Sequence, residues 1–273
     1  MSDIVLSAGV RSNLLQLQQT STLITQTQTR LSSGKKVNSA LDNAINFFTA
    51  QGLDNRSSDL SGLLDSMSNA INTIQAANNG ITAITKLVQS AQSLTSQANQ
   101  TTDTTTRATL STQFNALLVQ IGQLASDSGF NGVNLLANNT LTVVFDETGN
   151  SKTTVSGVDY TNANASPLSI ANAANNWAGA SDISAASTAL TAALTSLRSE
   201  SQTLSASLST VQIRQDFTKA TINTLQTGSA DLTLADSNEE GANLLALQTR
   251  QQLSSTALSL ASQADQNVLR LFQ

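Results

Sequence analysis

The sequence contains no cysteine and no histidine among its 273 residues. Without cysteine the chain can form neither a disulfide nor a thiolate site. Without histidine it lacks the commonest general base and the commonest metal ligand. Asp42, Asp54 and Asp59 fall in one stretch but lack the spacing of a metal-binding loop. We therefore expect no catalytic, metal or cofactor site, and a protein that is not an enzyme.

Charged and aromatic residues are also scarce. Charged residues make up 11% of the chain, against about 25% in ordinary globular proteins, and aromatic residues only 3%. The net charge of −5 and the pI near 4.6 argue against a nucleic-acid partner, which would require a basic face. No run of about 18 apolar residues is present, so we expect no membrane-spanning segment. Residues 1–5 lack the features of a Sec-type signal, which leaves export by another machine open.

A seven-residue apolar repeat marks the N-terminal region. Val10, Leu17, Ile24 and Leu31 recur every seven residues, with Leu14 beside them. Such a repeat predicts a coiled-coil seam on a helix over residues 4–31. The stretch around Gly34 then ends the helix, because glycine favours the left-handed conformation after a helix C-terminus. Residues 37–55 are expected to form a mixed extended or short helical link.

Three more helices are expected in the middle of the chain. Residues 57–99 carry two parallel apolar rows with seven-residue spacing, and residues 105–127 follow after an N-capping turn. Residues 182–227 form another apolar stripe, which Gly228 and its neighbours are expected to interrupt. Between them, residues 141–145 and 153–155 read as a hairpin, and residues 156–180 as a loop or small cap.

The last helix carries an apolar stripe over residues 243–273 that contains neither glycine nor proline. The order of elements is palindromic, so the chain is expected to fold back and place its two terminal helices side by side. The N-terminal helix can cover only one side of the terminal stripe. The predicted fold class is therefore mainly α: an elongated antiparallel helical bundle or coiled coil, with a small β-hairpin and paired N- and C-terminal helices.

Three short motifs resemble those of bacterial flagellins. Residues 30–45 read RLSSGKKVNSALDNAI, residues 129–136 read GFNGVNLL, and residues 266–272 read QNVLRLF. They occur in the family's order and at its distances from both ends, and the resemblance covers nearly the whole chain. The large outer domains of long flagellins are missing, as in short alphaproteobacterial members. The link motif comprises Arg30, Leu31, Ser32, Ser33, Gly34, Asn38 and Asp42.

The resemblance implies a domain organisation. Residues 1–38 and 234–273 would form the inner domain (D0) of the filament. Residues 39–138 and 181–233 would form the next shell (D1), and residues 139–180 a short surface segment. Inner-tube contacts between copies are then expected at these positions: Val10, Leu14, Leu17, Ile24, Leu31, Leu253, Leu260, Val268, Leu269, Leu271 and Phe272.

The resemblance also implies partners. These are other copies of the chain, hook-associated and cap proteins, and the flagellar type III export apparatus with its chaperone; the filament would be secreted and extracellular. Residues 89–94 replace the arginine- and glutamate-containing stretch that innate immune receptors recognise in some flagellins, so we expect weak or no recognition.

Two alternatives remain open at this stage. A hook–filament junction protein shares the terminal helices, but such proteins typically carry prolines in the link, and residues 38–44 contain none. A secreted helical translocator or adhesin would need an apolar, membrane-active segment, which the sequence does not show.

Overall fold

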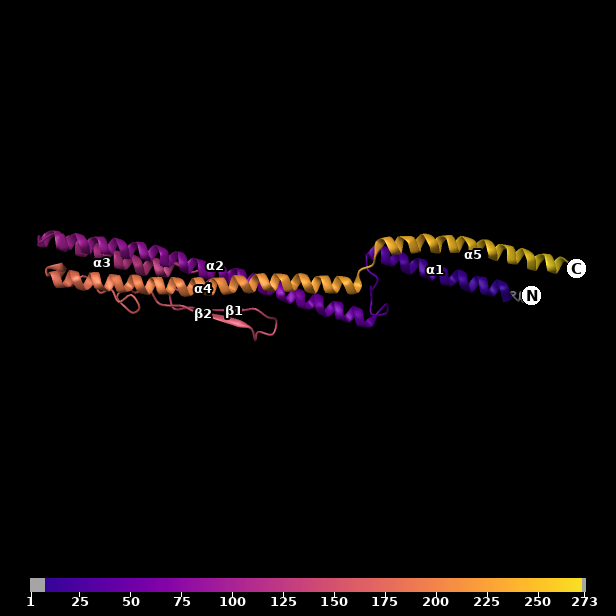
Figure 1. Cartoon of the computed structure of the whole chain (residues 1–273), viewed down its shortest axis with the longest axis horizontal. Coiled ribbons are helices and arrows are strands. Elements are labelled where there is room, and N and C mark those ends of the chain that lie inside the picture. Colours follow the sequence, from indigo (N-terminus) through magenta and orange to yellow (C-terminus); the bar gives the residue numbers. More distant parts are fainter. Residues whose placement is uncertain (1–7, 272–273) are drawn as a thin grey trace. The chain divides into compact units, whose positions relative to one another are not determined.

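The computed structural model describes residues 8–271, with side chains described from residue 8 to residue 267. The elements are, in order, α1 (Ala8–Ser33), α2 (Ala44–Gln100), α3 (Thr104–Asp127), β1 (Thr140–Val144), β2 (Lys152–Ser156), the 3-10 turn η1 (Ala174–Trp177), α4 (Ala180–Thr233) and α5 (Ser237–Leu271). The predicted fold class, mainly α with antiparallel helices and a hairpin, is confirmed (Figure 1). Within these residues, every helix is too short or too polar to cross a membrane.

The chain divides into two compact units. One comprises Met1–Asn55 and Thr224–Gln273, and the other Arg56–Asn223. The boundaries fall inside α2 and α4, so each of these helices contributes to both units. The expected division at residues 38/39 and 233/234 remains a prediction.

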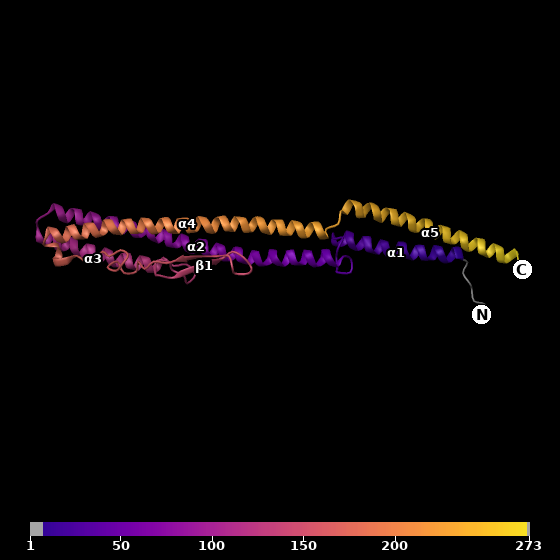
Figure 2. The same ribbon diagram turned by 60° about the horizontal axis from the view of Figure 1, so that its bottom comes forward.

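The unit Arg56–Asn223 has a continuous apolar core between three helices. The heptad rows of α2 are its centre: Met67, Ile74, Ile84 and Val88 are fully buried. They belong to one cluster with Phe114 and Ile121 of α3 and with Leu190, Leu197 and Leu204 of α4. Figures 1 and 2 both show these helices running alongside one another. The seven-residue repeats therefore mark the core of this bundle.

The hairpin closes one side of that core. β1 and β2 pair antiparallel, with Leu141 opposite Val155, as expected from the sequence. Val143, Phe145 and Val155 are buried in the cluster of the helical core. Within the turn, the backbone N–H of Ser151 donates to Asp146 Oδ1 at 2.8 Å. The hairpin is thus held by its own turn and by the apolar side chains beneath it.

The loop after the hairpin packs as a small cap. Trp177 is fully buried, and its ring centroid lies 4.9 Å from that of Phe114. Tyr160 is also buried in this cap, and burial raises the pKa of its hydroxyl to about 12. The two largest aromatic side chains of residues 156–180 therefore serve packing.

Two predicted helix boundaries are wrong. α2 begins at Ala44, so the link is much shorter than the expected residues 37–55; Asn43 caps the helix by accepting from the N–H of Asn46 at 3.0 Å. α4 continues through Gly228 to Thr233. A Cβ on Gly228 would lie 3.5 Å from Leu53, an ordinary contact distance, so α4 passes this glycine as it would pass an alanine. The start of α2 is set by the Asn43 cap.

Candidate assembly surface

The terminal helices α1 and α5 pack against each other as an antiparallel pair (Figures 1 and 2). On α1, Val10 is buried and Leu17 and Ile24 are half-buried, so three of the four heptad positions lie in the pair. The fourth, Leu31, is exposed, as is Leu14 beside the heptad. The seam predicted from the sequence therefore exists, but it covers only part of the apolar surface of α1.

Two buried threonines complete the paired face of α1. Thr20 and Thr27 lie on the same helical stripe as Val10 and Leu17, and both are buried. The hydroxyl of Thr20 donates to the carbonyl of Gln16 at 2.8 Å, which satisfies its polar atom within the helix. Reasoning from apolar residues alone missed both positions, although their heptad spacing could have found them.

The paired face of α5 is one side of the apolar stripe expected from the sequence. Half-buried side chains recur at Leu244, Leu247 and Leu258, on the side where α1 packs. Leu253 and Leu260 lie on another side of the same apolar stripe and are exposed to solvent. The N-terminal helix was expected to cover only one side of the stripe, and the side that α1 covers is that of Leu247 and Leu258.

We call the uncovered face the outer ridge of α5, defined by Leu245, Leu253 and Leu260. Their exposed fractions are 67%, 67% and 65%. Isolated exposed leucines are common, but a row at helical spacing makes this face a candidate interaction surface. The side chains of Val268, Leu269 and Leu271, and the whole of Phe272, lie outside the described residues.

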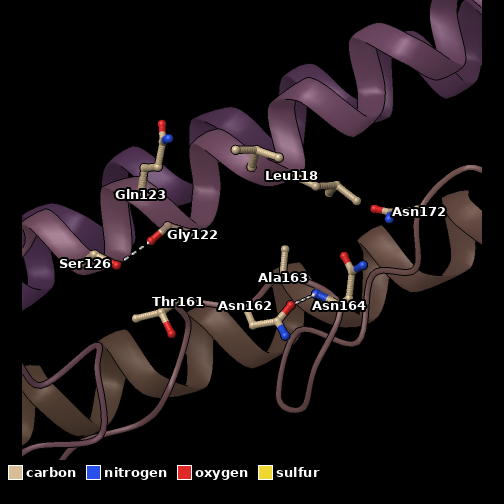
Figure 3. Close-up of a pocket in the computed structure, with 10 residues that line it drawn as sticks. Leu118, Gly122, Gln123, Ser126, Thr161, Asn162, Ala163, Asn164 and Asn172 are labelled. Carbon is tan, nitrogen blue, oxygen red and sulfur yellow. Dashed lines mark hydrogen bonds between the residues drawn. The ribbon is translucent and has the colours of Figure 1, made fainter.

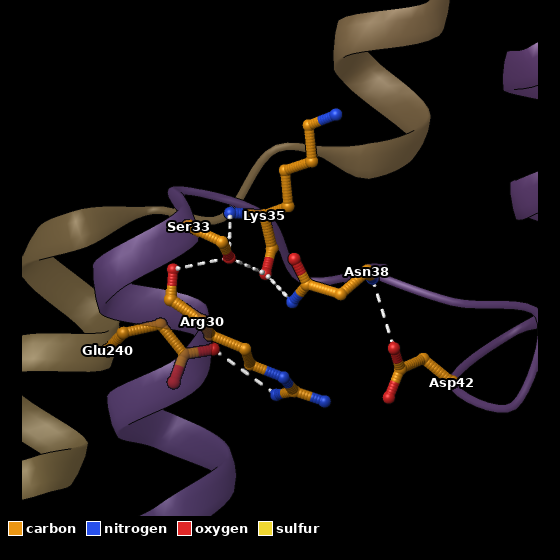
Figure 4. Close-up of polar contacts among 6 residues, drawn as sticks. All are labelled: Arg30, Ser33, Lys35, Asn38, Asp42 and Glu240. Atoms are coloured by element: carbon orange, nitrogen blue, oxygen red, sulfur yellow. Dashed lines mark hydrogen bonds and ion pairs between the residues drawn. The ribbon is translucent and has the colours of Figure 1, made fainter.

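An ion pair joins the two terminal helices next to the link (Figure 4). Arg30 Nη1 lies 3.2 Å from Glu240 Oε1. Glu240 is one of two acidic residues in the first turn of α5, where the positive end of the helix dipole favours a carboxylate. The pair borders a groove of about 300 Å³ that also includes Leu23, Leu247 and Arg250. Arg30, the first residue of the link motif, thus connects α1 to α5 through this ion pair.

The other motif residues build the turn after α1 (Figure 4). Gly34 has a φ of +67°, the left-handed conformation that favours glycine. The hydroxyl of Ser33 accepts from the N–H of Lys35 at 3.2 Å, and Asn38 Nδ2 donates to the carbonyl of Lys35 at 3.0 Å. Ser32, also in the motif, donates to the carbonyl of Thr29 at 3.0 Å. Each polar residue of the motif therefore has a local hydrogen-bonding role.

Asp42 organises the second half of the link. Its Oδ2 accepts from the backbone N–H groups of Asn38 and Ser39, each at 3.0 Å. The bond from Asn38, followed by that from Ser39, holds the pKa of this carboxyl below its ordinary value of 3.8. A charged Asp42 therefore stabilises the link.

Backbone pairing connects this turn to the chain entering α5. The N–H of Lys36 donates to the carbonyl of Thr233 at 2.7 Å, and the N–H of Ala235 donates to the carbonyl of Gly34 at 3.0 Å. Lys35 and Leu234 form an antiparallel bridge. The segment that leaves α1 and the segment that enters α5 are thus hydrogen-bonded to each other, and residues of the link motif form one side of this pairing.

A separate cleft of about 400 Å³ lies between α3 and the loop of residues 161–172 (Figure 3). All ten lining residues are uncharged: Leu118, Val119, Gly122, Gln123, Ser126, Thr161, Asn162, Ala163, Asn164 and Asn172. They offer amide and hydroxyl groups, which can hydrogen-bond a neutral partner but are poor acids and bases at neutral pH. The cleft suits binding better than acid–base chemistry.

Comparison with known proteins identifies the family. The model of the bacterial flagellin N-terminal helical region matches residues 8–140, and that of the C-terminal helical region matches residues 187–272. Flagellin FljK of Caulobacter vibrioides is 32% identical over 100% of this chain and 99% of its own length. The chain belongs to the bacterial flagellin family. This flagellin is accordingly a structural subunit of the helical filament of the bacterial flagellum.

One further relative matches over its full length, and one solved structure matches over part of the chain. A flagellin of Brucella melitensis is 29% identical over 100% of both chains. The crystal structure of Bacillus cereus flagellin has a TM-score of 0.48 and 16% identity, covering 56% of this chain and 88% of that chain. The full-length matches to Caulobacter and Brucella proteins confirm the short alphaproteobacterial type that the sequence motifs indicated.

Proposed function

We propose that this flagellin assembles its inner tube through the apolar surface that α1 and α5 leave uncovered. The observation that supports this proposal is the outer ridge of α5, whose three leucines are each about two-thirds exposed. Removing apolar surface from water stabilises association by roughly 25 cal/mol per Å². Heterologous contacts that do not close on themselves generate helical filaments. A ridge whose leucines stay exposed among the described residues is available for such contacts.

The proposed contact residues fall into two groups. Val10, Leu17 and Ile24 act within the α1–α5 pair and so set the shape of the inner domain. Leu14, Leu31, Leu253 and Leu260 are exposed and would touch other copies. Val268, Leu269, Leu271 and Phe272 belong to the same proposal on the evidence of the sequence pattern.

The wider cellular role follows from family membership and from the sequence. The filament would act outside the cell as a propeller for swimming, and this chain would serve mechanically instead of catalysing a reaction. It would leave the cell through the flagellar type III export apparatus with a chaperone, and would meet hook-associated and cap proteins. Its acidic composition supports the absence of nucleic-acid binding. Weak recognition by innate receptors stays a prediction, supported by the uncharged residues 89–94.

The outer ridge can be tested with a double variant. Leu253→Asn/Leu260→Asn should leave monomer helix content unchanged, since both side chains are exposed, yet abolish sedimentable filaments at concentrations where the wild type assembles. Gln252→Asn/Gln263→Asn, on exposed positions of the same helix, is the matched control and should assemble normally. Electron microscopy after seeding provides the readout. Normal tubes from the leucine variant would refute the proposed contact.

A further inference from the structure

The outer ridge of α5 lies on a side of the helix that also carries two exposed charges of opposite sign. Glu239 precedes the ridge, and Arg250 lies one helical turn before Leu253. Neither charged side chain makes an ion pair or a hydrogen bond within the described residues. Both charges need a partner when the ridge becomes buried between copies, because an unpaired buried charge is costly.

Glu239 stands in a region of negative net charge. Residues 30–42 and 231–240 comprise the link and the entry into α5, and together they hold five carboxylates and three cations. The ion pair between Arg30 and Glu240 uses one charge of each sign, which leaves four carboxylates and two cations. A cationic partner is therefore favoured at this end of α5.

Arg250 stands in a region of positive net charge. It is the only charged residue from position 241 to position 264, and residues 12–29 of α1 carry no charge. The other charged residues that line its groove, Arg30 and Glu240, offset one another. An anionic partner is therefore favoured at this position.

The two charges lie on the same side of α5, because the eleven residues between them (250 − 239 = 11) make three helical turns plus about 20°. Their separation along the helix axis is about 16 Å. A second α5 that runs parallel to the first and is displaced by eleven residues therefore presents its Glu239 to the Arg250 of the first. An antiparallel arrangement would pair the charges twice and close on itself, and a closed contact does not extend into a filament.

The same displacement sets large side chains against small ones. Leu253 of one copy lies opposite Ala242 of the other (253 − 242 = 11), and Ala264 lies opposite Leu253 (264 − 253 = 11). All three side chains are exposed. A displacement of seven residues would instead set Leu253 against Leu260 (260 − 253 = 7) and separate the two charges. Eleven residues is therefore the register that fits both the side-chain volumes and the charges.

We propose that the outer ridge of one copy packs on the outer ridge of a second copy in the filament, as parallel helices displaced by eleven residues. Glu239 of one copy pairs with Arg250 of the other. Each copy uses the two ends of one helix side for two different neighbours, so the contact repeats from copy to copy without closing. This inference rests on the proposed assembly through the outer ridge and names the surface that the ridge meets.

Cysteine cross-linking tests the register directly, because the wild type contains no cysteine. The double variant Ala246→Cys/Ala257→Cys gives every subunit both partners of the contact (257 − 246 = 11), and both positions are exposed, so the fold should be unaffected. Under mild oxidation its filaments should give a ladder of cross-linked oligomers. The yield should be about ten-fold above that of either single variant, since thiols held together have a high effective concentration.

The matched control is Ala246→Cys/Ala264→Cys, which tests a displacement of eighteen residues (264 − 246 = 18) on the same side of α5. It should give little product, because in the proposed register its thiols are too far apart for a disulfide. An equal ladder from this control, or no ladder from Ala246→Cys/Ala257→Cys in intact filaments, would overturn the proposed register while leaving filament assembly intact. Failure of the wild type to form filaments would instead count against the proposed function.

Charge reversal provides a second measurement. Glu239→Arg and Arg250→Glu should each raise the critical concentration for polymerisation about ten-fold, because like charges then meet at the contact. The double variant Glu239→Arg/Arg250→Glu should recover most of this loss, since every contact again joins opposite charges. Glu239→Arg/Lys86→Glu has the same net charge, with the second change at an exposed position of α2, and should not recover. A double variant Glu239→Arg/Arg250→Glu that assembles no better than the single variants would contradict the pairing.

Discussion

Arg30 of α1 and Glu240 of α5 form an ion pair with 3.2 Å between Nη1 and Oε1, although the two residues are 210 positions apart in the sequence. The side chain of Glu240 is 10% exposed and that of Arg30 is 32% exposed. The pair is therefore partly removed from water and joins the two terminal helices beside the link. A carboxylate in this position needs its partner, because an unpaired buried charge is costly.

Removing the arginine should weaken assembly. Arg30→Met is expected to cost about 1.5–3 kcal/mol, the usual range for a hydrogen bond to a charged group. Since 1.4 kcal/mol corresponds to a factor of ten, the critical concentration for polymerisation should rise about ten-fold or more. Light scattering across a concentration series provides the measurement. The double variant Arg30→Met/Glu240→Met should recover part of the loss; an Arg30→Met filament with wild-type critical concentration would show that the ion pair is dispensable.

A pair of glycine substitutions tests the packing of the cap on α3. A Cβ on Gly122 would lie 2.3 Å from the carbonyl oxygen of Thr161, so Gly122→Ala must displace the backbone of that loop. We expect it to lower the free energy of unfolding by about 1–3 kcal/mol, as overpacking does. Gly62→Ala in α2 has open space around it and should instead stabilise by up to about 1 kcal/mol.

Denaturant unfolding can follow both glycine variants through the fluorescence of Trp177, the only tryptophan in the chain. Gly122 and Trp177 belong to the same compact unit, so the probe reports on the region that is changed. Equal midpoints for the two variants would mean that the close approach at Gly122 is relieved without cost.

The link should lose order in acid because of Asp42. Hydrogen bonds from the N–H groups of Asn38 and Ser39 lower its pKa in the folded state. A carboxyl with a lowered folded pKa contributes stability above its unfolded value, and this contribution is lost as the pH falls through the folded pKa. The loss is therefore expected below the ordinary value of 3.8. Amide exchange at Asn38 and Ser39, measured by NMR against pH, should show protection disappearing there.

Two variants sharpen the Asp42 experiment. Asp42→Asn should reduce this protection at neutral pH and make it nearly independent of acid. Asp54→Asn makes the same chemical change at an exposed position of α2 and should leave the profile of the link unaltered. An acid profile that Asp42→Asn does not flatten would assign the loss of order to another group.

The sequence pattern predicted which segments are helical better than it predicted which side of each helix is buried or where each helix begins and ends. The Met67–Ile74 and Phe114–Ile121 repeats predicted the buried sides of α2 and α3, because those sides are apolar and the opposite sides are polar. On α5 the pattern did not tell which side would be covered, since Leu247 and Leu258 lie on one side of the apolar stripe and Leu253 and Leu260 on another. Periodicity shows that both faces exist, but only the position of α1 decides which one is covered.

The link shows a similar limit. Its motif identified Arg30 and Asp42 as important, but the pairing of Arg30 with Glu240 spans almost the whole chain and no local pattern predicts it. A cavity of about 220 Å³ likewise joins residues of α2, the hairpin turn and α4, which come together only in the folded unit. The early start of α2 depends on the cap at Asn43, whose side-chain oxygen accepts from the N–H of Asn46 at 3.0 Å.

The terminal helix pair should be stable only when assembled. Among the described side chains of α1 and α5, only Val10, Thr20, Thr27 and Glu240 are buried. Ordering each residue costs about 1–2 kcal/mol of backbone entropy, while burying a large apolar side chain returns roughly 1.5–3 kcal/mol. With so little burial, we expect the pair to exchange its amide hydrogens rapidly in dilute monomer.

Hydrogen exchange with mass spectrometry can compare monomer and filament directly. Residues 8–30 and 245–267 should become protected on assembly, because contacts on the outer ridge add the burial that the pair lacks alone. Segments around Ile74, Ile121 and Leu197, which are fully buried within their own unit, should be protected in both states and serve as the internal control. Strong protection of the terminal helices in dilute monomer would mean that the α1–α5 pair is stable by itself. Assembly would then join helix pairs that are already folded.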